Sequence, residues 1–151
     1  MLLRIPALLL AFALPLAPAQ AGLLERLGLT KAAPAAPSFL PVEQAFVVRH
    51  RQGDGRLTLT VDIAPGYYLY RHSLALSAEQ AELGDWTLPE GRPHQDEYFG
   101  QSQVYHQELQ LQVPLRATAD GGRVEFRYQG CTTGLCYPPQ VLSIHLAPNG
   151  D

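Results

Sequence analysis

The clearest sequence signal for the fold is the stretch Arg56–Ile63, which reads R-L-T-L-T-V-D-I. Apolar side chains occupy every second position, and threonine or aspartate stands between them. Successive side chains of a β-strand point to opposite faces, so this pattern predicts a strand with one face in a core and the other in water. The same alternation appears in three further stretches, Glu108–Leu115, Arg123–Tyr128 and Val141–Leu146.

Weaker strand patterns lie at Ala45–His50, Tyr67–Tyr70 and Leu74–Leu76. Glycine, proline and aspartate separate the strands and supply the turns between them. One helical turn is also expected, because Ser77 can cap Ala78–Leu83 and Gly84 can end it. Several short alternating strands of this kind predict an all-β fold, an immunoglobulin-like antiparallel β-sandwich.

Composition agrees with a single turn-rich domain. The chain has 151 residues, of which 46% are hydrophobic and 17% charged, and this excludes a disordered polyelectrolyte. Glycine and proline number 13 each, which favours strands and turns over a helical bundle. The net charge is −3 and Lys31 is the only lysine, so no nucleic-acid partner and no polybasic membrane contact is expected.

The N-terminus has the three parts of a secretory signal peptide. Arg4 precedes the apolar run Ile5–Leu16, and Ala19-Gln20-Ala21 supplies a small-residue cleavage pattern. The apolar run is too short to cross about 30 Å of hydrocarbon. Export would place the two cysteines where a disulfide can persist. The sequence thus divides into a signal peptide (1–21), an N-terminal extension and linker (22–38) and a β-sandwich domain (39–148).

Cys131 and Cys136 are the only cysteines, and they lie between two predicted strands. They would stand near the ends of a hairpin, within disulfide reach. A structural disulfide is a common fate for such a pair in a secreted domain. A bond that closes six residues, however, stabilises the fold by only about 2 kcal/mol. Both a structural and a redox-active disulfide therefore remain open.

Other chemistry is not indicated. The five histidines are not spaced at i, i+3 or i, i+4, so we expect no metal site and no cofactor. No nucleophile elbow or glycine-rich phosphate loop is present. The alternative to a redox module is a non-catalytic secreted sandwich that binds a partner by an edge strand or loop and carries a structural disulfide.

Three motifs around the cysteines resemble one known family. They are G-Y-Y-L-Y-R at Gly66–Arg71, D-E-Y-F-G at Asp96–Gly100, and Y-Q-G-C at Tyr128–Cys131 with C-Y-P-P at Cys136–Pro139. In this order they resemble the N-terminal periplasmic domain of the thiol:disulfide interchange protein DsbD. The first residues of the domain, Phe39–Phe46, resemble that family's first strand, and the likeness extends to about Leu146.

The resemblance implies an immunoglobulin-like domain that relays electrons as a thiol:disulfide oxidoreductase of the protein-disulfide reductase type. In that family a thioredoxin-like domain, fed through a membrane domain, reduces the cysteine pair. The pair then reduces oxidised periplasmic proteins of the thioredoxin fold, such as disulfide isomerases and the reductases of cytochrome c maturation. Because this sequence has no membrane domain before Asp151, the expected electron donor is a membrane protein on a separate chain, unless the chain is truncated.

The resemblance also implies roles for single residues. Cys136 would form the mixed disulfide with a partner, and Cys131 would resolve it. A cap loop that shields the pair and moves away on docking would consist of Asp96, Glu97, Tyr98, Phe99 and Gly100. Residues that would line the site are Tyr68, Tyr70 and Tyr137. The family usually has five residues between its cysteines, whereas this sequence has four.

Overall fold

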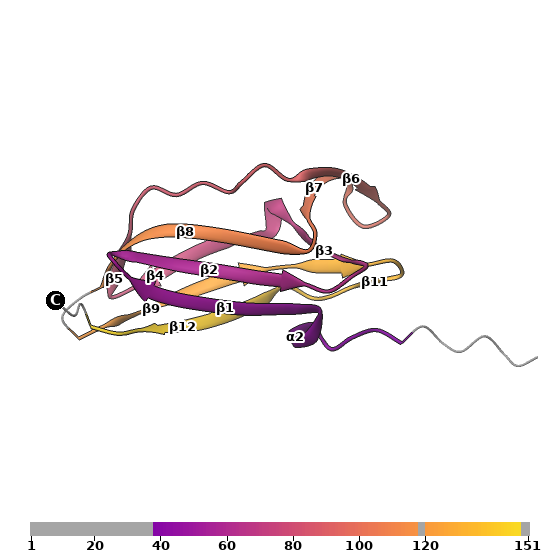
Figure 1. The fold of residues 1–151 in the computed structure, drawn as a ribbon. Coiled ribbons are helices and arrows are strands. Elements are labelled where there is room, and N and C mark those ends of the chain that lie inside the picture. Colours follow the sequence, from indigo (N-terminus) through magenta and orange to yellow (C-terminus); the bar gives the residue numbers. More distant parts are fainter. Residues whose placement is uncertain (1–37, 118–119, 149–151) are drawn as a thin grey trace, which may run out of the picture. The chain divides into compact units, whose positions relative to one another are not determined.

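The computed structural model describes residues 38–117 and 120–148 (Figure 1). The predicted signal peptide and the linker up to residue 37 lie outside the described residues. Within the described ranges, no helix is both long enough and apolar enough to cross a membrane.

Strands make up most of the described chain, and helix is confined to α2 (Val42–Ala45) and the 3₁₀ turn η1 (Arg71–Ser73). The strands are β1 (Phe46–Gly53), β2 (Arg56–Ile63), β3 (Tyr67–Tyr70), β4 (Ala75–Glu79), β5 (Ala81–Leu83), β6 (Arg92–Asp96), β7 (Gly100–Tyr105), β8 (Glu108–Ala117), β9 (Gly122–Tyr128), β10 (Gly130–Thr132), β11 (Leu135–Cys136) and β12 (Gln140–Leu146).

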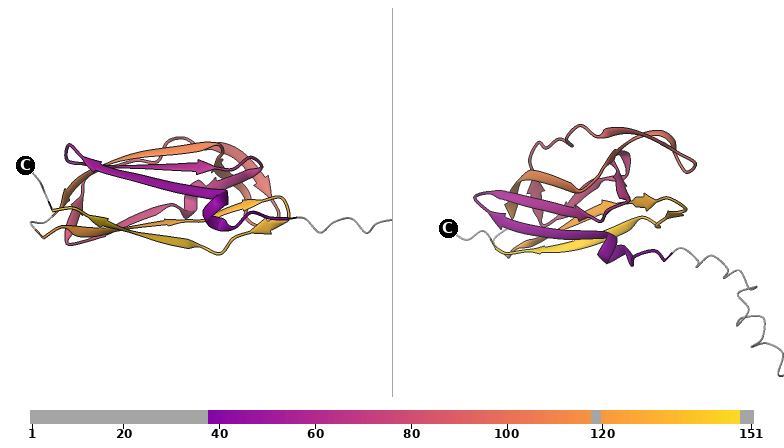
Figure 2. Two further views of the ribbon diagram at one scale, coloured as in Figure 1. Left: turned by 60° about the horizontal axis from the view of Figure 1, so that its bottom comes forward. Right: turned by 45° about the vertical axis from the view of Figure 1, so that its right-hand side comes forward.

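The strands form an antiparallel sandwich. One layer is the sheet β1-β2-β8-β5, and the sheet β12-β9-β4 faces it (Figures 1 and 2). A third sheet, β11-β10-β3-β7-β6, occupies one end of the sandwich, at the right in Figure 1. Every strand pair is antiparallel. The predicted all-β sandwich is confirmed.

The core lies between the two layers, as the alternating pattern predicts. Pairing of β2 with β8 sets Leu57 opposite Val113, Leu59 opposite Leu111 and Val61 opposite Leu109, and all six side chains are buried. Their intervening neighbours are more exposed, so the two strands present one apolar face. Because β2 and β8 hold their register through these pairs, a slip of one residue would turn the apolar set to water.

The predicted helical turn Ala78–Leu83 is wrong. This stretch forms the end of β4 and the whole of β5, which pair with β9 and β8 respectively. Since β9 and β8 belong to opposite layers, the chain changes layer between β4 and β5. Gln80 makes the break with a φ of 54°, in the left-handed region. At the other end of the domain, Ala45 closes α2 and does not begin β1 as predicted.

The strand that carries Cys131 continues directly from the core. Only Gln129 separates β9 from β10, and β10 then pairs with β3. All four residues of β3 are buried, because this strand lies in the middle of the end sheet between β10 and β7. Continuation from β9 and pairing with β3 therefore fix the position of β10, the strand that carries Cys131.

Candidate functional site

The two cysteines form a disulfide across a short hairpin. Cys131 on β10 lies directly opposite Cys136 on β11, with 4.1 Å between their Cα atoms. The turn between the strands contains only Thr133 and Gly134, and Gly134 has a φ of +85°, which glycine adopts without a steric penalty. The sequence analysis places the cysteines near the ends of a hairpin and within disulfide reach, and in the structure they are direct cross-strand partners.

The two sulfur-bearing residues differ in their surroundings. β10 lies between β3 and β11, and Cys131 is fully buried opposite Tyr68. β11 is the two-residue edge strand of the same sheet, and Cys136 is partly exposed. A reagent or partner at the surface therefore meets Cys136 first.

A small apolar cluster surrounds the buried sulfur. It consists of Tyr68, Tyr70, Val104 and Cys131, with Cys136 packed against it. The rings of Tyr68 and Tyr70 meet edge to face with 5.4 Å between their centroids. The structure thus brings both predicted lining tyrosines of β3 to the cysteine pair.

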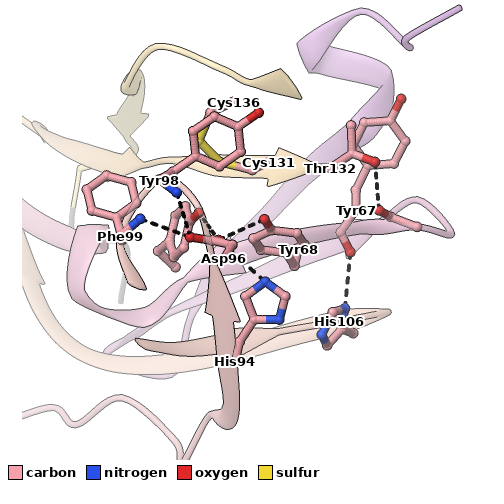
Figure 3. Close-up of polar contacts among 12 residues, drawn as sticks. Tyr67, Tyr68, His94, Asp96, Tyr98, Phe99, His106, Cys131, Thr132 and Cys136 are labelled. Atoms are coloured by element: carbon pink, nitrogen blue, oxygen red, sulfur yellow. Dashed lines mark hydrogen bonds and ion pairs between the residues drawn. A yellow bond between two sulfur atoms is a disulfide. The ribbon is translucent and has the colours of Figure 1, made fainter. Parts of the chain in front are cut away.

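Asp96, the first residue of the predicted cap loop, connects that loop to the tyrosines (Figure 3). Its Oδ2 accepts hydrogen bonds from the hydroxyl groups of Tyr68, at 2.9 Å, and Tyr70. Its Oδ1 accepts hydrogen bonds from the backbone N–H groups of Tyr98, at 3.0 Å, and Phe99, at 2.9 Å. One carboxylate therefore fastens the loop to the wall of the cysteine cluster.

These bonds favour the ionised form of Asp96. Burial raises the pKa of Asp96, but the hydrogen bonds from Phe99, Tyr70, Tyr68 and Tyr98 lower the pKa by more, to about 2. Burial raises the pKa of Tyr68 to about 12, and it raises the pKa of Tyr70 as well. At neutral pH both phenols thus keep their protons and donate hydrogen bonds to a charged carboxylate. A hydrogen bond to an ionised acceptor is stronger than one between two neutral groups.

The predicted cap loop forms the tip of the β6–β7 hairpin. Glu97, Tyr98 and Phe99 make the turn, and Gly100 starts β7 with a φ of +65°. The Phe99 ring packs on Tyr70, at 4.6 Å between centroids, and on His72, at 4.9 Å. Tyr98 and Phe99 are 39% and 45% exposed, and Figure 3 draws the Tyr98 ring in front of the disulfide.

Tyr137, the third predicted lining residue, lies elsewhere. Its ring belongs to the main core and packs edge-on against Phe46, at 5.8 Å between centroids. Its hydroxyl donates a hydrogen bond of 2.5 Å to the carbonyl of Leu40, ahead of the first strand. Tyr137 thus follows Cys136 in the chain but does not join the cluster around the sulfurs.

One residue that the sequence analysis did not select, His94, also reaches the site. The His94 ring packs on Tyr68, at 4.3 Å between centroids, and its Nε2 lies 3.4 Å from Oδ2 of Asp96. Tyr67, by contrast, belongs to the main core, where its hydroxyl accepts a hydrogen bond of 2.8 Å from the N–H of Leu40. His94 lies two residues before Asp96, so both side chains are on the same face of β6. If the sequence pattern had indicated a strand here, it would have predicted that His94 lies beside Asp96.

Comparison with known proteins identifies the family. The family model described as "Thiol:disulfide interchange protein DsbD, N-terminal" matches residues 36–148. The chain belongs to this family. Among its relatives, the thiol:disulfide interchange protein DsbD of Haemophilus ducreyi is 42% identical over 113 residues, which cover 75% of this chain and 20% of the relative. The DsbD of Yersinia pestis is 46% identical over 110 residues, covering 72% of this chain and 18% of the relative.

Solved structures of the DsbD N-terminal domain share the fold. The reduced domain of Neisseria meningitidis DsbD superimposes with a TM-score of 0.65 at 33% identity, covering 74% of this chain and 91% of that chain. A complex between the DsbD and PilB N-terminal domains of the same organism gives a TM-score of 0.61 at 31% identity, with 76% and 97% covered. The resemblance drawn from the sequence motifs is thereby confirmed, and this chain spans about a fifth of the length of the two full DsbD relatives.

Proposed function

We propose that this domain is a thiol:disulfide exchange module that passes electrons through Cys131 and Cys136 to oxidised proteins of the thioredoxin fold. The observation that carries this proposal is the asymmetry of the disulfide. One sulfur is buried on an inner strand, and the other is partly exposed on an edge strand of two residues. A disulfide that only stabilises the fold gains no stability from the exposure of one sulfur.

The exchange would take two steps. The Cys136 thiolate attacks the partner's disulfide, so that a Cys136–partner bond forms and the partner's own bond breaks to release a thiolate. The Cys131 thiolate then attacks the sulfur of Cys136, which forms the Cys131–Cys136 bond and releases the second partner sulfur. The released partner thiolates take up protons from solvent. The domain loses two electrons in this reaction, and the partner gains them.

The differing exposure of the two sulfurs supports a separate role for each. A thioredoxin-fold partner is large, so its disulfide can approach only a sulfur at the surface, which favours Cys136 as the attacking group. Cys131 lies directly opposite and is held by β3, which suits it to the second, intramolecular attack. In this scheme the Asp96–Gly100 cap loop covers the pair between encounters.

The setting of this reaction is part of the same proposal. The signal peptide (1–21) would export the chain to the periplasm, and the linker (22–38) would precede the exchange domain (39–148). A membrane donor would return the domain to its reduced form. Disulfide isomerases and cytochrome-maturation reductases are the acceptor classes that the family suggests, and a relative has been solved in complex with the N-terminal domain of PilB.

Trapping with single-cysteine variants tests the proposal. The probe is a thioredoxin-fold protein that keeps only its exposed cysteine, carried as a mixed disulfide with thionitrobenzoate. We expect reduced Cys131→Ala to release thionitrobenzoate and form the protein–protein disulfide at least about tenfold faster than Cys136→Ala. Equal rates would remove the assignment of roles.

A second outcome would overturn the function itself. If neither variant forms the mixed disulfide, and if glutathione does not reduce the wild-type domain without denaturant, the disulfide is structural. The domain would then be a binding module of the kind that the sequence analysis left open.

A further inference from the structure

We propose that Tyr67 and Tyr137 are positioning residues for disulfide exchange, because their hydroxyl groups hold the backbone of Leu40 beside the cysteine hairpin. We call Leu40 and these two hydroxyls the Leu40 clamp. This inference rests on the function proposed above. It adds that the clamp keeps the two sulfurs close together after the bond between them has been broken.

The hydrogen bonds reach Leu40 from β3 and from the residue that follows β11. Its N–H donates to the hydroxyl oxygen of Tyr67, at 2.8 Å, and its carbonyl accepts from the hydroxyl of Tyr137, at 2.5 Å. Tyr67 stands on β3 opposite Thr132, the residue after Cys131. Tyr137 is the residue after Cys136. The backbone of Leu40 is thereby bonded to the residue after Cys136 and to the strand that pairs with the Cys131 strand.

The tyrosine rings hold the two hydroxyls in place. Both rings are buried and meet the ring of Phe46 edge to face, with centroid distances of 6.0 Å for Tyr67 and 5.8 Å for Tyr137. Because packing fixes the rings, little side-chain entropy is lost when the hydroxyls bind Leu40. Phe39 extends the same segment to the hairpin turn, where a β-carbon placed on Gly134 would lie 3.8 Å from the Cζ atom of Phe39.

β11 needs such support because it has few other bonds. It consists of two residues at the edge of its sheet and pairs only with β10. Beyond Cys136, the chain is held by the N–H of Tyr137 on the carbonyl of Gly130, at 3.1 Å, and by the side chain of Gln129 on the carbonyl of Tyr137, at 2.9 Å. The Tyr137 hydroxyl adds a bond that ties β11 to a segment outside the hairpin.

The clamp acts on the reaction through the effective concentration of one thiol at the other. When both cysteines are reduced, free movement of β11 lowers this concentration, and restraint raises it. A higher effective concentration favours the disulfide over the dithiol, and it also speeds the attack of Cys131 on a mixed disulfide at Cys136. Burial raises the pKa of Tyr137 to about 12, so its hydroxyl stays protonated throughout the pH range in which exchange occurs.

Removal of single hydroxyl groups tests the proposal. Tyr137→Phe and Tyr67→Phe keep the rings against Phe46, delete one bond to Leu40 each, and also remove the contact between the two hydroxyls. Tyr105→Phe is the matched control, because the buried Tyr105 also donates a hydroxyl hydrogen bond to a carbonyl, that of Pro89 at 2.6 Å, and its ring is not in the cysteine cluster. The measurement is the equilibrium of each domain with reduced and oxidised glutathione, followed by counting free thiols.

We expect each clamp variant to shift the equilibrium toward the dithiol by about three- to tenfold, or about 15–30 mV for a two-electron couple. The Cys136–glutathione mixed disulfide should persist longer in these variants by a similar factor, and Tyr105→Phe should match wild type. If the hydroxyl groups only stabilise the fold, all three variants should have a lower free energy of unfolding and an unchanged reduction potential.

The outcomes separate this inference from the function on which it rests. If the wild-type domain equilibrates reversibly but both clamp variants stay within twofold of it, the clamp has no role in exchange. An equal shift in Tyr105→Phe would also overturn the clamp, since the effect would then follow from loosening anywhere in the domain. If the wild-type domain does not exchange with glutathione at all, the proposed function fails.

Discussion

Gly130 shows how closely side chains pack beside the cysteines. A β-carbon at this position would lie 2.2 Å from Cζ of Phe46 and 2.6 Å from the carbonyl oxygen of Tyr68. The Phe46 ring is itself held by Tyr67, Tyr128 and Tyr137, so it cannot move aside. Glycine is therefore required here for space, and not for an unusual φ.

We accordingly expect Gly130→Ala to lower the free energy of unfolding by about 1–3 kcal/mol. Urea denaturation at neutral pH measures this difference. Gly53→Ala is the control, because nothing lies within 4 Å of a β-carbon at Gly53. An unchanged stability for Gly130→Ala would show that the ring of Phe46 does not fill this space in solution.

Asp96 makes the stability of the domain depend on pH. Its pKa is about 2 in the folded domain and 3.8 without the surrounding contacts, so the folded state favours the ionised carboxylate. The resulting stabilisation is present above about pH 4 and is lost as the pH falls toward 2.

Asp96→Asn should therefore be less stable than wild type by about 2 kcal/mol at pH 6, with the gap closing between about pH 4 and pH 2. Urea titrations of both proteins across this range measure the gap. Asp85→Asn, which removes an exposed carboxylate outside the strands, is the control for the change in charge. A gap that stays constant with pH would contradict the role of the ionised carboxylate.

At the scale of elements, strand prediction succeeded where one face of a strand is buried and the other is wet. β2 and β3 have the predicted bounds, and β8, β9 and β12 differ from their predicted ranges by one or two residues at an end. β6 and β7 were missed because β6 is a polar edge strand that contains Pro93, so there was no apolar alternation to detect. The residues from Ala78 to Leu83 are good helix formers, and pairing with β9 and β8 overrides that preference.

The β6–β7 hairpin also carries the cap loop, whose shielding role remains a prediction. Tyr98→Ala with Phe99→Ala should speed the alkylation of reduced Cys136 by a small reagent about tenfold. The expected gain is modest because each ring is already 39% or 45% exposed, and so loses only part of its buried area. Mass spectrometry after timed alkylation identifies the modified sulfur.

The control for this variant is Val141→Ala, an equally simple loss of exposed apolar surface on β12. Circular dichroism establishes that both variants are folded. A change of less than about twofold in the alkylation rate would mean that the two rings do not shield Cys136.

For the whole molecule, the sequence motifs predicted the sandwich, the family and the placement of Tyr68 and Tyr70 beside the cysteines, but not the contacts that connect these residues. The cysteines, Tyr68, Tyr70 and Asp96 come from separate motifs, and only the order of strands in the end sheet brings them together. The bond from Tyr137 to Leu40 joins residues 97 positions apart. No local periodicity encodes such a contact, because it depends on how two sheets and the segment before the first strand pack.

Since the core is formed by the two layers, the domain should not depend on its disulfide for folding. The bond closes only six residues, so its reduction should lower the free energy of unfolding by about 2 kcal/mol and leave the fold intact. Urea denaturation of the oxidised and reduced domain measures this. Cys136→Ser, which cannot form the bond, should match the reduced wild type, and a reduced domain that is unfolded without urea would contradict the prediction.

The bonds at Leu40 are made by its backbone N–H and carbonyl, and the residue is 38% exposed. An alanine scan would therefore pass over this residue, because alanine supplies the same N–H and the same carbonyl. Evolutionary selection for these bonds would not restrict the amino acid at position 40, because every amino acid except proline provides both groups. It would act on the two tyrosines instead. A change to the backbone itself is needed to test this residue. Leu40→Pro, or an ester introduced by semisynthesis in place of the amide between Phe39 and Leu40, removes the N–H that donates to the hydroxyl of Tyr67.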